Sequence, residues 1–278
     1  MKGKSGITGA GRAVFGLAML LMVLCTIFPF LWMVSTSFKY DTQVFTNPIE
    51  WIPNPVNWKN YVRVWSEVPF ASFYRNTAIV AIGGTALQVF CCSMAAYAFA
   101  KIKFWGKDAL FIVFLATMMV PWHTIMIPQH MLMGKLGMHD RLITLILMQG
   151  FSAFGIFLMR QFLMGIPDEL GEAAKIDGAG EFRTFFQIVM PQAKPGAATL
   201  TIFTFVGQWN DYISPLIYLN SPEKYTLQLG LKLFATEHTM QYGLTMAGTL
   251  CAMLPLVVVY LIFEKQITKG IVFTGMKG

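Results

Sequence analysis

Long apolar windows separated by short polar segments dominate the pattern along this chain. A helix needs about 20 apolar residues to cross a bilayer core, and the window at 13–38 contains no charged residue. Six windows predict six transmembrane helices, at about 13–38, 76–100, 109–128, 142–160, 195–219 and 242–263. The competing interpretation of the first window, a cleaved signal peptide, is disfavoured by its length and by the lack of a clear cleavage site. We predict an all-α integral membrane protein, with 1–278 as one transmembrane domain.

The composition agrees with this class. The chain is 55% hydrophobic and 13% charged, against about 25% charged residues in typical soluble domains, and its mean hydropathy is +0.56. The net charge of +7 does not indicate nucleic-acid binding, because no basic patch is interleaved with aromatic residues. The four cysteines all lie in apolar windows without metal-ligand spacing, so we predict neither a metal nor a redox site.

One charged segment, 166–194, interrupts the apolar pattern. Asp168 and Glu169 suit a helix N-terminus, where the helix dipole favours anions. Gly178 and Gly180 are expected to end that helix, because glycine enters a left-handed cap at little cost. A second helix is predicted from Glu181, with an apolar stripe at Phe182, Phe185, Phe186 and Val189, and Pro191 is expected to break it. Two such short helices must dock on something, either spans, lipid or a partner protein.

The same segment contains a family motif. The run E-A-A-K-I-D-G-A-G at 172–180, followed by I-V-M-P at 188–191, resembles the EAA loop of ABC-transporter membrane subunits. Glu172, Ala173, Ala174, Gly178 and Pro191 match that pattern. The I-D-G-A variant, which includes Asp177 and Ala179, and the W-N-D-Y run near 210 resemble the carbohydrate permeases of the MalG-like branch.

The resemblance implies a permease subunit of a binding-protein-dependent sugar importer of the bacterial cytoplasmic membrane. It implies four kinds of partner: a second homologous permease, an ABC ATPase dimer, an extracytoplasmic substrate-binding protein and a sugar. Loop 166–194 would then couple the spans to the ATPase. The chain has no P-loop motif, so ATP and Mg are expected on the partner ATPase, with no cofactor and no covalent chemistry here. From periodicity alone, an amphipathic loop lying on lipid remains an equal interpretation.

The distribution of basic residues predicts the orientation. Six spans place both termini on one side, and the segments on that side hold 13 lysines and arginines against 8 on the other. Because cytoplasmic loops are enriched in basic residues, we predict that both termini and loop 166–194 are cytoplasmic.

Four polar residues inside predicted spans are candidates for a translocation path: Gln88, Gln149, Asn210 and Asp211. Either glutamine could bind sugar hydroxyls, although a bond between helices is the commoner role. Asp211 could line the pathway, because a buried charge usually faces a cavity or a partner. Alternatively, the fifth span ends near Trp209. The histidines His123 and His130, seven residues apart, suggest solvated interfacial positions more than a metal pair.

Two other classes of protein compete with this interpretation. An ion-coupled secondary transporter should contain intramembrane charged relays and inverted repeats, and only Asp211 fits. A membrane-embedded enzyme should show a catalytic motif, and none is present. Among importers, a permease for a polyol or a glycerol-phosphate is the nearest alternative.

Overall fold

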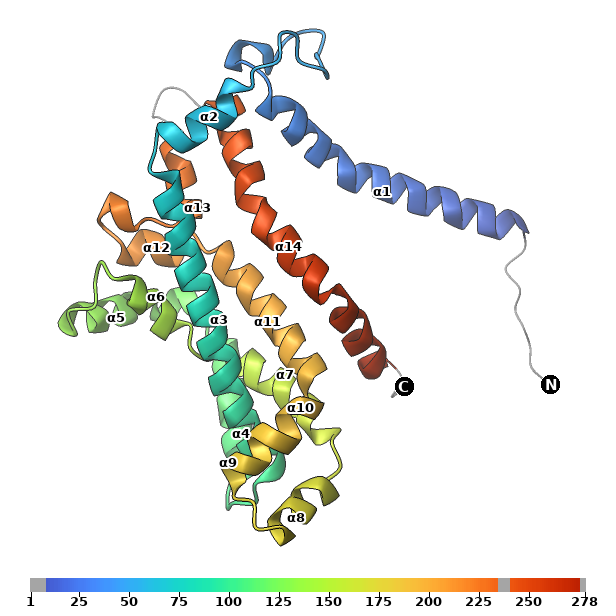
Figure 1. The fold of residues 1–278 in the computed structure, drawn as a ribbon, viewed down its shortest axis with the longest axis vertical. Helices are drawn as coiled ribbons and strands as arrows, with labels where there is room; N and C mark the ends of the chain where they lie inside the picture. Colours follow the sequence, from blue (N-terminus) through green and yellow to red (C-terminus); the bar gives the residue numbers. More distant parts are fainter. Residues whose placement is uncertain (1–8, 235–240, 276–278) are drawn as a thin grey trace. The chain divides into compact units, whose positions relative to one another are not determined.

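A computed structural model describes residues 9–234 and 241–275, and every regular element in those ranges is helical. The chain divides into two compact units. Unit 1 comprises Met1–Val68 and Leu233–Ala252, and unit 2 comprises Pro69–Lys232 and Met253–Gly278. Figure 1 labels the helices of both units. The predicted all-α class is confirmed.

The α-helices are α1 Gly9–Ser37, α2 Lys59–Ser66, α3 Phe70–Lys101, α4 Lys107–Ala116, α5 Trp122–Lys135, α6 Leu142–Met148, α7 Ala153–Met164, α8 Glu169–Ile176, α9 Glu181–Thr184, α10 Met190–Gln192, α11 Lys194–Trp209, α12 Ile213–Tyr218, α13 Leu227–Leu231 and α14 Tyr242–Gly275. A π-helical turn, η3, occupies Phe185–Val189. Short 3-10 turns lie at Asp41–Gln43, Thr117–Met119, Pro222–Lys224 and Lys232–Phe234.

Three described helices are long and apolar enough to cross a bilayer, at Gly11–Ser37, Phe70–Lys101 and Tyr242–Glu264. Counting each of two bent helix pairs as one span raises the total to five. The predicted windows at 13–38, 76–100 and 242–263 therefore coincide with helices. Two of these helices exceed their windows, because α3 begins at Phe70 and α14 continues to Gly275.

In unit 1, α2 is held against the carboxyl end of α1. The Asn60 amide nitrogen donates hydrogen bonds to the carbonyls of Ser37, at 3.0 Å, and Lys39, at 2.9 Å. Asn60 is only 2% exposed. It thus satisfies carbonyl groups that the end of a helix leaves without intrahelical partners. The Lys39 side chain is buried with its ammonium group over the Trp32 ring, and this burial lowers its pKa.

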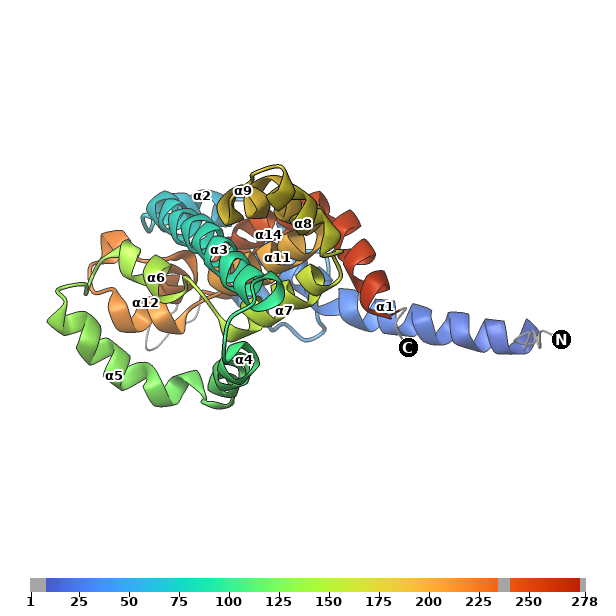
Figure 2. The same ribbon diagram turned by 90° about the horizontal axis from the view of Figure 1, so that it is seen from below.

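The predicted single span at 109–128 is wrong as a continuous helix. The structure has α4, a 3-10 turn and α5, with a bend of 96° between the two halves. Val120 is extended (ψ 113°) and Pro121 precedes α5. The residue before a proline disfavours the helical conformation, so the helix stops there. Seen from below in Figure 2, α5 extends away from α3, α7 and α11 of the same unit.

The predicted span at 142–160 is also two helices, α6 and α7, bent by 50°. The break at 149–152 contains Gly150, and Ser152 caps α7 by accepting a hydrogen bond from the Gly155 amide, at 3.0 Å. Serine is among the most favourable N-cap residues, so a new helix begins here inside the apolar window.

The predicted span at 195–219 ends early. Helix α11 stops at Trp209, and α12 begins at Ile213 after a break at Asn210, Asp211 and Tyr212. The helix therefore ends at Trp209, the position at which the alternative interpretation placed the end of the span. With 16 residues, α11 is about 24 Å long, shorter than a typical bilayer core.

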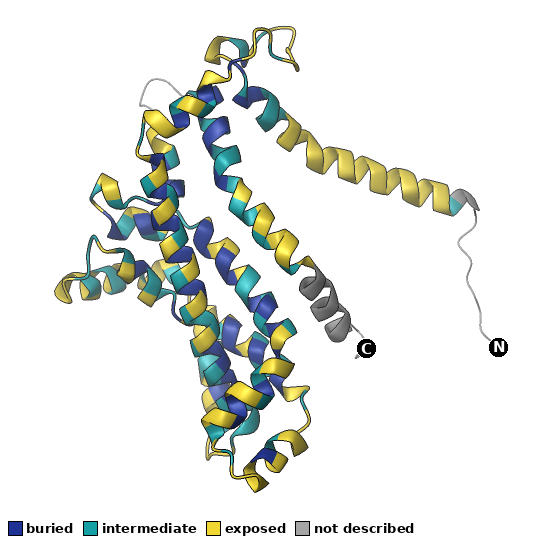
Figure 3. Cartoon of the chain, in the orientation of Figure 1, coloured by how far each residue is buried: buried dark blue, intermediate teal, exposed yellow. Residues whose placement is uncertain are grey.

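Helix α3 is the centre of unit 2. It packs along α7 and α11 and also contacts α6. The core there is apolar and includes Cys92, Ala96, Met159, Leu163 and Leu200, all fully buried. Figure 3 shows buried positions concentrated on the facing sides of these helices. This core positions the 166–194 segment at one end of α3.

Candidate functional site

The short helix α8, which contains most of the EAA motif, ends in a Schellman cap. The amide of Gly178 donates to the Lys175 carbonyl, at 3.0 Å, and that of Ala179 to the Ala174 carbonyl, at 2.9 Å. These two bonds define this cap, and the residue at its turn takes a left-handed conformation. Gly178 has φ +79°, as predicted. Gly180 does not share this role, because it is extended (φ −72°) and precedes α9.

An ion pair and a hydrogen bond fix this loop to α3. Lys175 of α8 lies 2.6 Å from Glu181 of α9, and the Tyr97 hydroxyl of α3 donates to the same carboxylate at 2.8 Å. Lys175 and then Tyr97 hold the pKa of Glu181 below its ordinary value. The turn between α8 and α9 is thus braced against a long helix of unit 2.

A second contact fixes the start of the loop. The Lys101 ammonium group, at the end of α3, donates to the Ile166 carbonyl and to the Asp168 carboxylate, both at 2.5 Å. These bonds to Lys101 lower the pKa of Asp168. Both ends of α8 are therefore connected to α3 by polar contacts.

Most of α8 remains exposed (Figure 3). Ala174 is buried at 4% exposure, and the other motif residues Glu172, Ala173, Asp177 and Gly178 are exposed. Apolar side chains also stay uncovered: Ile176 is 88% exposed and Phe182 69%. A charged and apolar surface of this kind on two fixed short helices, α8 and α9, suits contact with another molecule.

The prediction that Pro191 breaks the second helix is wrong. Helical backbone continues from α9 through η3 and past Pro191 to Gln192, the end of α10, and a single turn residue, Ala193, precedes α11. Proline lacks an amide hydrogen and clashes with the carbonyl four residues back. The π-helical turn immediately before Pro191, in which the Met190 amide bonds the Phe185 carbonyl, accommodates it without ending the helix. The predicted apolar stripe is split, with Phe185 and Val189 buried and Phe182 and Phe186 exposed.

Two of the candidate path residues meet where helices break. The Gln149 side chain, from the α6–α7 break, donates to the Asp211 carboxylate, from the α11–α12 break, at 2.9 Å. The buried Gln208 amide lies 3.3 Å from that of Gln149 and, oriented to donate, reaches the carbonyls of Val80 and Ala81. Gly84 makes room, because a Cβ there would lie 2.2 Å from the Gln208 side-chain amide group. Sequence reasoning missed Gln208.

The other two candidates lie in separate contacts. Gln88 of α3 donates to the Ser152 hydroxyl at 2.9 Å, which is the helix-to-helix bond expected as its commoner role. Asn210 accepts from Gln228 at 3.2 Å and is exposed. The structure therefore brings together Gln149 and Asp211, while Gln88 and Asn210 have other partners.

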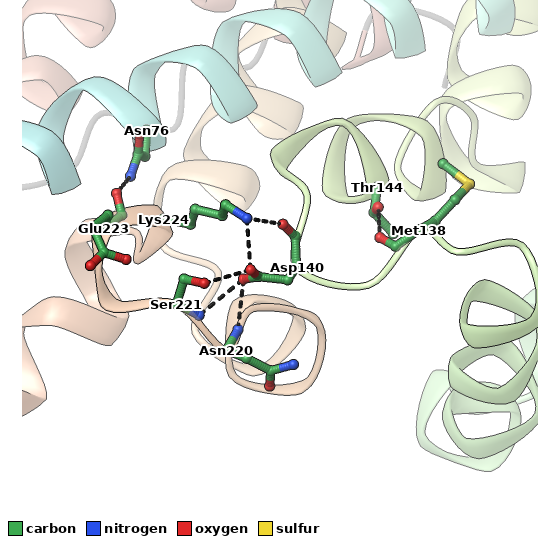
Figure 4. Close-up of polar contacts among 8 residues, drawn as sticks. All are labelled: Asn76, Met138, Asp140, Thr144, Asn220, Ser221, Glu223 and Lys224. Carbon is green, nitrogen blue, oxygen red and sulfur yellow. Dashed lines mark hydrogen bonds and ion pairs between the residues drawn. The ribbon is translucent and has the colours of Figure 1, made fainter.

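A further polar cluster, which sequence reasoning missed, is centred on Asp140 (Figure 4). Its carboxylate accepts hydrogen bonds from the backbone amides of Asn220 and Ser221, both at 3.0 Å. It also accepts from the Ser221 hydroxyl and from the Lys224 ammonium group, both at 2.6 Å. The hydrogen bond from Lys224 makes the largest contribution, and those from Ser221 the next, to holding the pKa of Asp140 far below its ordinary value. The cluster joins the loop before α6 to the segment after α12.

The two histidines considered from the sequence do not pair. His130 instead contacts His139, with ring centroids 4.2 Å apart and the rings tilted by 35°, and His123 lies against Trp122. Within the described ranges, no group of three or more His, Cys, Asp or Glu side chains could hold a metal ion.

The structure combines long apolar helices, helix pairs broken at polar residues and an exposed loop that is fixed to α3. This combination is typical of a polytopic membrane protein of the transporter type. A family described as "Binding-protein-dependent transport system inner membrane component" matches residues 88–271. The chain therefore belongs to this family, and the predicted resemblance to carbohydrate ABC-transporter permeases is confirmed.

Several named transport-system permeases are similar over nearly the whole chain. The lactose transport system permease LacG of Rhizobium radiobacter is 32% identical, over 90% of this chain and 91% of its own length. The arabinooligosaccharides transport system permease AraQ of Halalkalibacterium halodurans is 29% identical, over 91% of each chain. The sn-glycerol-3-phosphate transport system permease UgpE of Yersinia enterocolitica is 31% identical, over 94% of this chain and 96% of its own.

A solved structure has the same fold. It is described as a bacterial ABC transporter involved in the import of the acidic polysaccharide alginate. One of its chains aligns with a TM-score of 0.84 and 24% identity, covering 96% of this chain and all of that chain.

Proposed function

We propose that this chain is the membrane-spanning permease subunit of an ATP-driven importer for a sugar or oligosaccharide. It would form half of a translocation pathway with a second, homologous permease. A separate ATPase dimer would bind ATP and Mg, and an extracytoplasmic binding protein would deliver the substrate. The family match supports the permease role, and the names of the lactose and arabinooligosaccharide relatives support the substrate class.

The observation that carries the coupling role is the attachment of α8. A Schellman cap fixes its end, and the Lys175–Glu181–Tyr97 contacts and the Lys101–Asp168 contact connect it to α3. Its outward residues, including Glu172 and Ile176, are exposed. We propose that α8 docks on the ATPase and that motion of the ATPase reaches the spans through α3.

The proposed topology has six spans, with α11 as the fifth, both termini in the cytoplasm and loop 166–194 on the same side. The excess of basic residues on that side supports it. A cysteine placed at Glu172, in a background without the four native cysteines, should react with a membrane-impermeant maleimide in inverted vesicles. Reaction only in right-side-out vesicles would contradict the orientation.

We propose that the polar contact between Gln149 and Asp211 lies on or beside the sugar path. Broken helices expose backbone groups that are tolerated at membrane depth only when buried in protein or lining a cavity. Amide and carboxylate groups at such breaks can bind hydroxyl groups. Substitution of Gln149 by leucine should therefore raise the substrate concentration needed for half-maximal uptake.

The test of the proposed function is reconstitution with and without the ATPase. Proteoliposomes with both permeases, the ATPase and the binding protein should accumulate a labelled saccharide only when ATP is supplied. Accumulation by this chain alone, driven by an ion gradient, would instead establish a secondary transporter.

The similarity to UgpE supports a second candidate substrate, a glycerol-phosphate or a polyol. Competition of unlabelled lactose, arabinooligosaccharides, glycerol 3-phosphate and sorbitol against uptake of the labelled substrate separates these candidates. Strong competition by glycerol 3-phosphate alone would replace the sugar assignment.

A further inference from the structure

The loop 102–106 joins two hydrophobic helices through five residues. The candidate span α3 ends at Lys101, and α4, the first half of a bent candidate span, begins at Lys107. A connection this short between two apolar helices must lie where the hydrocarbon core meets water. The chemistry of this loop should therefore suit the headgroup region of a lipid bilayer.

The aromatic residues of the loop point outward. Trp105 is 100% exposed and Phe104 is 40% exposed, with the Phe104 ring 6.2 Å from that of Phe99. A fully exposed indole is unfavourable in water, whereas at a bilayer boundary its apolar ring and its polar N–H group both find suitable surroundings.

Basic groups flank these aromatic residues. Lys103, Phe104, Gly106, Lys107 and Asp108 line a hollow of about 330 Å³, near the lower end of the roughly 300–1,000 Å³ of ligand pockets. Among the described residues, neither Lys103 nor Lys107 forms an ion pair.

The other basic side chains near the hollow, Lys101 and Arg160, each form an ion pair within the chain. Lys101 contacts Asp168 at 2.5 Å, and Arg160 lies 3.7 Å from Asp108. Lys103 and Lys107 interact with Asp168 only through longer-range electrostatics, so their ammonium groups give the hollow a positive charge, and an anion is the ligand that it would attract.

We propose that Lys103 and Lys107 bind the phosphate group of an anionic lipid, with Trp105 inserted beside its acyl chains. Because Lys101 of the same turn bonds Asp168 at the start of the 166–194 loop, the lipid would sit against the base of α8. Any effect of this lipid on transport rests on the proposed coupling role of that loop, but the binding itself does not.

The test uses the assembled transporter in nanodiscs containing either brominated phosphatidylglycerol or brominated phosphatidylcholine at equal fractions. The fluorescence difference between the wild type and the Trp105→Phe variant isolates the Trp105 signal. We expect phosphatidylglycerol to quench Trp105 several-fold more than phosphatidylcholine does. Lys103→Gln with Lys107→Gln should abolish this preference, because each basic residue near an anionic surface contributes about fivefold in affinity, or about 1 kcal/mol.

The control is Lys59→Gln with Lys135→Gln, which makes the same change in charge at two exposed lysines elsewhere and should leave the preference intact. Equal quenching by both lipids in the wild type would overturn the proposal. So would complete competition by millimolar inorganic phosphate, which would indicate a site for a free anion. If the Lys103→Gln, Lys107→Gln variant lost its co-purifying ATPase but kept the wild-type preference for phosphatidylglycerol in quenching, the two lysines would instead be assigned to a protein contact. ATP-dependent uptake by the wild type is measured separately, so failure of lipid binding is distinguishable from failure of the proposed transport function.

Discussion

Backbone conformation at a single residue sets the end of α8. Gly178 has φ +79°, and no atom lies within 4 Å of where a Cβ would be, so the constraint there is conformational and not one of space. The E-A-A and glycine spacing predicted this turn correctly because a left-handed cap has few alternatives to glycine. The spacing did not predict which of Gly178 and Gly180 forms the cap. The hydrogen bonds that distinguish them go to the backbone carbonyls of the preceding helical turn, at Ala174 and Lys175.

We expect Gly178→Ala to destabilise the cap by about 1 kcal/mol, because an L-residue with a Cβ is disfavoured in the left-handed region. Hydrogen exchange of the α8 amides should become about fivefold faster. Gly178→Asn is the matched control, since asparagine tolerates this conformation better than other residues. Equal exchange rates in the alanine variant and the wild type would contradict the cap assignment.

The charge of Asp140 is the second property that belongs to one residue. Its folded-state pKa is below the ordinary value of 3.8, mainly because of Lys224. Its contribution to stability is therefore complete above about pH 4 and is lost as the pH falls through the depressed folded-state value. Side-chain exposures of 43% for Lys224 and 24% for Asp140 moderate the contribution.

We expect Asp140→Asn to lower stability by about 1–2 kcal/mol at neutral pH, after allowance for solvent exposure. Asparagine suits the left-handed backbone at this position, where φ is 57°, so the variant adds no backbone strain. It removes the charge and replaces one of the two acceptor oxygens by an NH2 group. The difference in melting temperature between variant and wild type should be constant down to about pH 4 and should shrink as the pH is lowered from about 4 to about 2. A difference that stays constant over this range would show that the carboxylate charge is not responsible.

At the scale of helices, hydropathy located the spans but not their breaks. The windows at 13–38 and 242–263 coincide with helices because mean apolarity decides whether a segment crosses a bilayer. The breaks at Pro121, Gly150 and Asn210 lie inside apolar windows, where local backbone chemistry decides. Pro121 and the polar pair Asn210 and Asp211 are visible signals in the sequence, and the Ser152 cap is a local one that hydropathy does not register. The contact of Gln149 with Asp211 depends on segments that meet only in the folded chain.

The Asp140 cluster illustrates the same limit. Its partners Asn220, Ser221 and Lys224 lie about eighty residues away along the chain. An isolated aspartate in a polar link gives no pattern from which such a cluster can be predicted.

The junction of α1 and α2 gives a test at the element scale. Asn60→Ala should lower the stability of unit 1 by about 1–3 kcal/mol, because the carbonyls of Ser37 and Lys39 lose their donor. Asn60→Asp should be worse, since it places a carboxylate in a 2% exposed position facing two carbonyl oxygens. Thermal unfolding checks this order. Lys59→Ala, at the exposed neighbouring position, should change stability by no more than about 0.5 kcal/mol.

At the scale of the whole molecule, the fold and the family agree with a membrane-embedded transport subunit, and the sequence contains no P-loop motif for ATP. Its long helices supply the spans, and α3 connects the broken-helix region around Gln149 to the loop that contains α8. The central claim is that nucleotide-driven motion of another chain enters through α8. Glu172 is suited to test this claim because it is exposed and, among the described residues, its side chain makes no ion pair.

The most direct measurement compares ATP-dependent uptake and ATP hydrolysis in proteoliposomes holding either the wild-type transporter or its Glu172→Arg variant. We expect the variant to insert and melt like the wild type, while uptake falls at least about tenfold, the effect of about 1.4 kcal/mol at the interface. Glu223→Arg, the same charge reversal at another exposed glutamate, should leave uptake near the wild-type level. Wild-type uptake and substrate-stimulated hydrolysis in the Glu172→Arg transporter would contradict the coupling role of α8.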